Sequence, residues 1–236
     1  MKFPAFGRKK HIRIPPLKRF PVHLRGGILL WGGILSWNTP DISKSNKTPL
    51  VFTDPQKGYD EALYEVKRRY ESDPNKYFYC DQYSNLNNPL AHYETTAAEL
   101  LEQAPFITHF VGGVGTGGTI SGIGRRLKES NASIQVVCID FDEWPGVEGL
   151  KPLSEGHIIP KTFDRSVVDR MLEIDVLQAY DVSRLMARRG IFTGQSSGAY
   201  LLGAKIVAEE AQLGHVVTIF NDIGERYFST SMWNWY

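Results

Sequence analysis

The stretch HFVGGVGTGGTISGIGRRL, residues 109–127, joins a β-branched and aromatic run to a helical pattern through a cluster of glycines. The first run is typical of a buried strand. A glycine-rich turn between a strand and a helix lets backbone amides approach a ligand closely. Several classes of protein place such a loop at the mouth of a parallel sheet, and the rest of the chain must decide among them.

On both sides of this stretch, strand patterns alternate with helix patterns. Strands are predicted at residues 49–54, 76–81, 107–113, 134–142, about 170–174 and 215–222, and helices at 58–72, 92–103, 119–130, 176–190 and 199–212. Such alternation is the signature of βαβ units and predicts an α/β fold with a buried parallel sheet. Ligands on these sheets bind at the carboxyl ends of strands, where the glycine loop falls.

The charge of the chain is distributed unevenly. Its 236 residues carry a net charge of +1, but the first fifty contain ten Lys or Arg and one acid, Asp41. The remaining 186 residues contain 17 basic and 25 acidic side chains. A basic segment of this kind is compatible with nucleic acid or an anionic membrane. A solvated arm is the commoner case, so we expect neither partner.

Other classes of protein are disfavoured by the cysteines, histidines and apolar runs. Cys80 and Cys138 form no CxxC pair, and the six histidines form no HxxxH or HxH pair, so no metal site is expected. The longest apolar stretch, residues 26–37, is too short to cross a bilayer. Pro15 and Pro16 break the basic leader that precedes it. We therefore expect a cytoplasmic protein.

The glycine loop satisfies the G-x-G-x-x-G pattern at Gly113, Gly115 and Gly118, and Asp140 and Asp142 follow about twenty residues further on. On the pattern alone, this is the fingerprint of a dinucleotide-binding protein. Two βα units precede it, however, whereas the fingerprint generally opens its domain. A dinucleotide site and a tight turn without a ligand both stay open as hypotheses.

A second loop, Gly194-Gln195-Ser196-Ser197-Gly198, satisfies G-x-S-x-G, the nucleophile elbow of α/β-hydrolases. That fold requires an acid and then a histidine after the serine. Asp222 is available, but no histidine lies beyond His215. A hydrolase triad is therefore rejected.

A third hypothesis uses both loops together. The GTGGT loop offers backbone amides and two hydroxyls, those of Thr116 and Thr119, to a compact phosphate monoester. Ser196, at another strand end, is suited to hydrogen-bond a ring nitrogen.

This combination resembles the fold-type II pyridoxal-phosphate enzymes. Within them it is similar to the cysteine synthases (O-acetylserine or O-phosphoserine sulfhydrylases) and cystathionine β-synthase. Six motifs carry the resemblance, in the family's order: TDPQKGYDEAL, YFYCDQYSNLNNPLAHYETTAAEL, GTGGTISGIGRRLKE, GVEGLKP, GQSSGA and GERYFST. They cover about residues 51–232.

The resemblance implies pyridoxal phosphate as cofactor and assigns roles to individual residues. The phosphate would be held by a loop that we call the phosphate cup, or simply the cup. Its residues are Gly115, Thr116, Gly117, Gly118 and Thr119. Ser196 would face the pyridine nitrogen, leaving it largely unprotonated. Gln82 would reach the substrate carboxylate and Tyr83 would line the same pocket, although a turn residue and simple packing are the alternatives for these two.

The resemblance also implies a domain organisation: a pyridoxal-phosphate-binding large domain at residues 86–232 and the remnant of a small domain at 51–85. Residues 1–49 match nothing in the family, and we predict that this basic segment is disordered. It is either a frameshift product or a real fused segment.

One departure from the family concerns catalysis. The family's Schiff-base lysine belongs to a PSGSxKDR-like segment, and a TSGNTG-like loop grips the substrate carboxylate; neither occurs in this sequence. Lys44 and Lys47 lack the surrounding motif. The implied function is the formation of cysteine from an activated serine and sulfide, in a family that commonly forms homodimers. We expect the present chain to be inactive, and the alternative is a non-catalytic relic or interaction protein that retains the phosphate cup.

Overall fold

The computed structural model describes residues 51–54, 58–142, 146–154, 156–228 and 230–233. The basic segment at residues 1–49 lies outside these ranges, so its predicted disorder stays a prediction.

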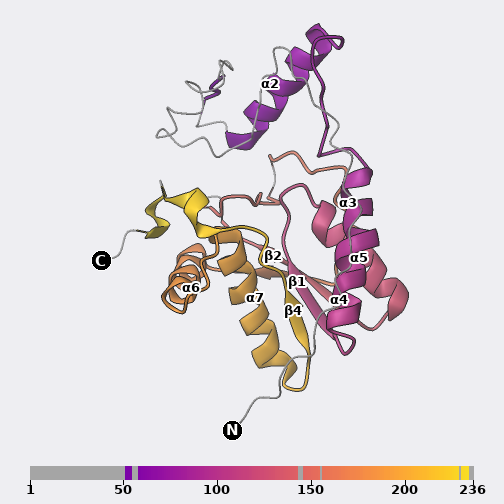
Figure 1. Ribbon diagram of the computed structural model, residues 1–236, viewed down its shortest axis with the longest axis vertical. Coiled ribbons are helices and arrows are strands. Elements are labelled where there is room, and N and C mark those ends of the chain that lie inside the picture. The colour runs from indigo at the N-terminus through magenta and orange to yellow at the C-terminus, as the bar shows by residue number, and fades with distance from the viewer. Residues whose placement is uncertain (1–50, 55–57, 143–145, 155, 229, 234–236) are drawn as a thin grey trace, which may run out of the picture.

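Four parallel strands form the sheet at the centre of the molecule (Figure 1). Their order is β3-β2-β1-β4, with bounds β1 (His109–Gly112), β2 (Gln135–Asp140), β3 (Arg170–Glu173) and β4 (Val216–Thr218). In the register, His109 of β1 lies between Gln135 of β2 and Val216 of β4. The predicted α/β fold with a parallel sheet is confirmed.

Helices cover both faces of the sheet (Figure 1). One face carries α3 (Asn87–Ala91), the π-helical turn η2 (His92–Thr96), α4 (Ala97–Gln103) and α5 (Gly118–Ser130). The other carries α6 (Val176–Arg188) and α7 (Gln195–Ala211). Short 3-10 turns complete the described elements: η3 (Arg165–Val167), η4 (Gly224–Tyr227) and η5 (Ser231–Trp233).

The core consists of two apolar clusters, one on each face of the sheet. Phe110 and Val136 pack beneath α4 and α5, whereas their chain neighbours Val111 and Val137 pack beneath α6 and α7. Because successive side chains of a strand point to opposite faces, one short apolar run serves both clusters. This explains why the strands are apolar throughout and do not alternate with polar residues.

Helix α2 (Gly58–Ser72) lies away from the sheet, beyond the carboxyl ends of the strands (Figure 1). An ion pair between a buried lysine and a half-buried carboxylate connects it to the rest of the structure: the ammonium of Lys151 contacts the carboxylate of Asp60. The other Asp60 oxygen accepts a hydrogen bond from the backbone N–H of Ile158 at 3.1 Å.

Two predicted strands are wrong. Residues 51–54 and 76–81 contain no strand, and residues 49–50 lie outside the described ranges. Both segments have the right composition, but a strand requires a hydrogen-bonded neighbour, and none of the described strands pairs with them. Both belong to the segment predicted to be a small-domain remnant.

Three element boundaries also differ from the predictions. The predicted helix at 92–103 opens with the π-helical turn η2 and continues the preceding α3. Helix α7 begins at Gln195 and not at residue 199, so the GQSSG motif is the first turn of a helix. Strand β4 has only three residues.

Within the described ranges, no helix is long and apolar enough to cross a membrane. The same residues contain no group of three or more His, Cys, Asp or Glu side chains placed to hold a metal ion.

Candidate functional site

The candidate site lies where β1 and β4 end. These strands are parallel neighbours, so the loops that follow them, residues 113–117 and 219–222, meet at the same edge of the sheet. The first turns of α5 and α7 begin beside these loops (Figure 1). The parallel topology therefore brings together the two glycine motifs of the sequence, which are about eighty residues apart.

The first loop is built so closely that two of its glycines have no room for a side chain. Gly117 has φ of +84°, and a Cβ atom on it would lie 2.5 Å from the Cβ of Phe163. A Cβ atom on Gly115 would lie 2.6 Å from the carbonyl oxygen of Gly149. The left-handed conformation at Gly117 lets the chain turn directly into α5. The result is a loop that runs directly into the N-terminus of a 13-residue helix.

A cavity of about 200 Å³ opens at this loop. It is lined by Gly113, Gly115, Thr116, Gly117, Thr119, Gly149, Leu150, Tyr200 and Asn221. The N-terminal end of α5 supplies backbone N–H groups that no carbonyl within the helix accepts, and the positive end of the helix dipole. The cavity is therefore suited to a compact anion such as a phosphate group.

Thr119 contacts His92, a residue of the π-helical turn. The Thr119 Oγ1 and His92 Nε2 atoms are 3.1 Å apart, and His92 Nδ1 lies 3.0 Å from Thr96 Oγ1. Burial lowers the pKa of His92 and so favours the neutral ring. A hydroxyl that lines the cavity is thus held by a half-buried imidazole.

Ser196 is buried in the first turn of α7 and hydrogen-bonds to the loop after β4. Its hydroxyl lies 3.1 Å from Asp222 Oδ2 and 3.4 Å from Asn221 Oδ1. The hydroxyl donates to the Asp222 carboxylate in preference to the Asn221 amide oxygen, because the carboxylate is charged and lies nearer. Ser196 does not itself line the 200 Å³ cavity, but Asn221 does.

Asp222 accepts hydrogen bonds from several groups that surround Ser196: the backbone N–H of Gly194 (3.2 Å) and the hydroxyls of Ser197 (2.6 Å) and Tyr227. Burial, and then the bond to Asp222, raise the pKa of Tyr227, which keeps its hydroxyl protonated as a donor. One carboxylate thus fixes the start of α7 and the turn η4 together.

Gln82 and Tyr83 lie in a loop that is fastened to the cup through their backbone. Asn88 Nδ2 donates to the carbonyl oxygen of Gln82 at 2.8 Å, and the backbone N–H of Thr162 donates to that of Tyr83 at 3.1 Å. The Gln82 side chain is exposed. Burial and the charge of Asp60 raise the pKa of Tyr83.

The structure brings only part of the predicted site together. Of the eight predicted residues, four line the cavity: Gly115, Thr116, Gly117 and Thr119. Gly118, Ser196, Gln82 and Tyr83 lie around it without lining it. Tyr200, Asn221, Asn88 and Thr162 were not foreseen. Asn221 is the last residue but one of the strand predicted at 215–222, and a position near a strand end is the one sign of a site residue in the sequence.

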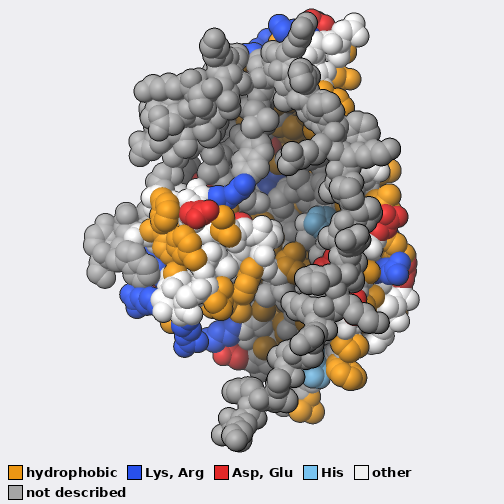
Figure 2. Space-filling view, in the orientation of Figure 1, with side chains coloured by type: hydrophobic (Ala, Val, Ile, Leu, Met, Phe, Trp, Pro, Cys, Tyr) orange, Lys and Arg blue, Asp and Glu red, His pale blue; other side chains and the backbone are white. Residues whose placement is uncertain are grey.

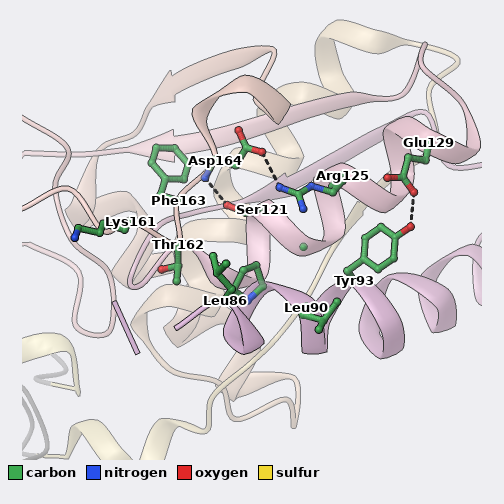
Figure 3. A pocket seen from close by; sticks show the side chains of 12 residues that line it. Leu86, Leu90, Tyr93, Ser121, Arg125, Glu129, Lys161, Thr162, Phe163 and Asp164 are labelled. Carbon is green, nitrogen blue, oxygen red and sulfur yellow. Dashed lines mark hydrogen bonds and ion pairs between the residues drawn. The ribbon is translucent and has the colours of Figure 1, made fainter. Parts of the chain in front are cut away.

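A larger pocket of about 630 Å³ lies between α3, η2, α5 and residues 161–164 (Figure 3). Its lining contains none of the residues of the 113–119 loop. Arg125 pairs with Asp164 at 3.1 Å, and the hydroxyl of Tyr93 donates to Glu129, so each of these three charged side chains already has a partner within the wall. The pocket has no built binding group, and we assign it no ligand.

A family model described as "Pyridoxal-phosphate dependent enzyme" matches residues 47–222. Over 201 residues, the chain is 41% identical to a cysteine synthase of Aquifex aeolicus (strain VF5). That match covers 82% of this chain and 61% of the relative.

The comparison with solved structures also finds proteins of this kind. The chain is similar to a cysteine synthase from Entamoeba histolytica with a TM-score of 0.71 and 29% identity, over 83% of this chain and 60% of the other. It is also similar to an O-acetylserine dependent cystathionine beta-synthase from Helicobacter pylori, with a TM-score of 0.68 and 29% identity, over 79% and 63% of the two chains. The chain thus spans about three fifths of the length of these proteins.

Proposed function

Because the chain belongs to the pyridoxal-phosphate dependent enzyme family, we propose that its glycine cup binds the phosphate of pyridoxal phosphate. The reaction class we propose is the β-replacement of cysteine synthases, in which an activated serine and sulfide give cysteine. One observation carries the proposal: the loop before α5 excludes side chains at Gly115 and Gly117 and lines a cavity at the N-terminus of that helix.

The residues around the cup have separate proposed roles. The amides of residues 115–119 and the hydroxyls of Thr116 and Thr119 hold the phosphate. Ser196 faces the pyridine nitrogen: its single hydroxyl hydrogen, which donates to Asp222 in this structure, turns to that nitrogen when the cofactor binds, and its neighbour Asn221 lines the cavity. Gln82 binds the substrate carboxylate and Tyr83 lines the same pocket. Bound pyridoxal phosphate supplies an electron sink, and the protein supplies binding and orientation.

We propose further that the 236-residue chain by itself does not form cysteine. The sequence contains no PSGSxKDR-like segment to supply the lysine that the family bonds to its cofactor. Lys151 is adjacent to the cavity residue Leu150, but its ammonium is engaged by Asp60 and it does not line the cavity. Serine hydroxyls and backbone amides form no imine, so the described cup offers no substitute.

The experiment is a binding and activity comparison on the purified chain. Pyridoxal phosphate should bind weakly, inorganic phosphate should compete with it, and no cysteine should form from O-acetylserine or O-phosphoserine with sulfide. Tight binding of NAD that phosphate does not weaken would overturn the proposal in favour of the dinucleotide hypothesis. Cysteine formation that Lys44→Ala or Lys47→Ala abolishes would overturn the proposed inactivity.

We also propose a homodimer in the cytoplasm, with an amino acid as the small-molecule ligand. In support of association, Figure 2 shows hydrophobic side chains gathered on one face near the C-terminal turns. Among the C-terminal residues, Phe192 makes tilted ring contacts with Phe228 and Trp233, and Phe228 is 67% exposed. Apolar clusters of this kind often mark interfaces. Sedimentation of the chain and of Phe228→Ser tests this: a monomer at all concentrations would refute the dimer, and fractionation of cells would test the location.

A further inference from the structure

The side-chain amide of Asn88 joins two loops that the proposed function assigns to different parts of the bound molecule. Its Nδ2 donates to the carbonyl oxygen of Gln82 and to Thr116 Oγ1, each at 2.8 Å. A backbone carbonyl only accepts hydrogen bonds, so it fixes which end of the amide faces it. Both hydrogens of the amide nitrogen are then used, one in each loop.

The bond to Thr116 determines what its hydroxyl offers to the cavity. Thr116 Oγ1 accepts from Asn88 and, at 3.3 Å, from the backbone N–H of Gly118. A hydroxyl oxygen has two lone pairs and one hydrogen, so these bonds leave the hydrogen free to donate. Thr116 lines the cavity, and a phosphate oxygen is an acceptor. The amide of Asn88 therefore turns this hydroxyl toward an anion as a donor.

The same two loops are joined a second time by Thr162, which is buried. Its Oγ1 donates to the carbonyl oxygen of Thr116 at 2.6 Å, while its backbone N–H donates to Tyr83. Gly118 leaves the space that the Asn88 amide occupies: a Cβ atom on Gly118 would lie 1.9 Å from Asn88 Oδ1. The connection is thus built into the cup itself.

We propose that Asn88 is a positioning residue that couples the phosphate cup to the loop carrying Gln82 and Tyr83. It presents the Thr116 hydroxyl to the phosphate, and phosphate in the cup in turn restrains the Gln82 loop. The role of Asn88 rests on the proposed function and deepens it. Phosphate bound in the cup would reduce the mobility of the Gln82 loop, which is assigned to bind the substrate carboxylate.

The test uses the full chain, with inorganic phosphate and pyridoxal phosphate as probes. Asn88→Ala should weaken the binding of both, by about tenfold, as expected for a lost hydrogen bond to a charged group. Asn85→Ala is the matched control, because the Asn85 amide donates to Cys80 in the same loop and does not reach the cup. The control should bind phosphate as the unsubstituted chain does.

Two further readouts separate positioning from a general loss of structure. In a double-mutant cycle, Asn88→Ala and Thr116→Val should be strongly non-additive for phosphate affinity, because both remove the same donor. Phosphate should also slow hydrogen exchange at the backbone amides of Ser84 and Asn85, which donate to the carbonyl of Asp81 within this loop. That slowing should vanish in Asn88→Ala.

The outcomes distinguish this proposal from the proposed function. Phosphate binding by the unsubstituted chain that Asn88→Ala leaves unchanged, or additive effects in the cycle, would overturn the role of Asn88 alone. If the unsubstituted chain binds neither probe, the proposed function and this inference fail together. Should Asn88→Ala not fold, Asn88→Leu, which keeps the volume of the side chain without its two donor hydrogens, replaces it in the same measurements.

Discussion

The sheet with its helices and the segment around α2 are stabilised in different ways. In the sheet, apolar residues such as Phe110, Val111 and Val136 are completely buried, and the cup follows directly after strand β1. Between residues 51 and 96, no residue whose burial is described is buried; the first is Ala97. Helix α2 instead has polar contacts through Asp60 with Lys151, His157 and the backbone of Ile158.

The difference shows how each region should respond to change. Apolar burial is spread over many residues, so substitutions in the sheet reduce stability by graded amounts. A segment held by few polar contacts detaches when one of them is lost. The cup belongs to the first region, and the loop with Gln82 joins the two.

The largest effect on stability and phosphate binding is expected for Gly117→Val. At Gly117 the backbone is left-handed, and an added Cβ atom would lie 2.5 Å from the Cβ of Phe163. Strain and overpacking together should destabilise the chain by about 3 kcal/mol, and binding of phosphate should be lost. Urea denaturation and calorimetry measure the two effects. Gly190→Val is the matched control: φ is +83° and nothing lies within 4 Å, so it should cost only about 1 kcal/mol and leave phosphate binding intact. Equal losses in the two variants would show that the crowding around Gly117 is unimportant.

The same contrast explains how much of the molecule the sequence predicts. The strands at 107–113 and 134–142 and the helix after the glycine loop are encoded by local patterns, which is why their positions were predictable. The strands expected at 49–54 and 76–81 have the right composition but no described partner, and pairing is not a local property. In the site, glycine motifs predict the cup. Asn88 and Thr162 reach Thr116 across 28 and 46 residues, which no periodicity reveals.

Lys151→Met should sharpen the contrast by releasing α2. The Lys151 side chain is 4% exposed, and its removal leaves the Asp60 carboxylate with the backbone N–H of Ile158 and the imidazole of His157, 3.7 Å away, as its remaining partners. Loss of one member of such an ion pair costs about 3 kcal/mol. Detachment of α2 exposes Asp60 to water and removes this cost, so the loss of stability is confined to α2. Amides of α2 should exchange roughly 100-fold faster, while those of β1 and β2 keep their protection. Lys205→Met, which breaks an exposed pair with Glu209, is the control and should change neither. Slow exchange in α2 of the Lys151 variant would show that other contacts hold the helix.

Tyr227→Phe should give a smaller, graded effect inside the sheet region. The substitution removes one donor to Asp222, which still accepts from Gly194, Ser196 and Ser197. We expect a loss of about 1 kcal/mol in the free energy of unfolding without a change in fold. Chemical denaturation measures it, with Tyr64→Phe, on the exposed side of α2, as the control. A collapse of the native near-ultraviolet spectrum would mean that this hydroxyl alone holds η4.

The smallest effect on stability is expected at the two cysteines, which report on the two regions separately. Cys80 is exposed in the segment after α2, whereas Cys138 is buried in β2. Burial, and then the charge of Asp140, raise the pKa of the Cys138 thiol to about 12. Since the folded pKa is raised, the stability that comes from keeping this thiol neutral is fully present below its ordinary value of 9.0 and is lost as the pH rises through about 12.

Near neutral pH, a thiol reagent should therefore modify Cys80 rapidly and Cys138 only at the rate of unfolding, because the reaction requires both a thiolate and access to it. Cys80→Ser should abolish the rapid phase and change the free energy of unfolding by less than about 0.5 kcal/mol. Rapid modification of Cys138 in the folded Cys80→Ser chain would place the weak point in β2, and the contrast between the two regions would fail.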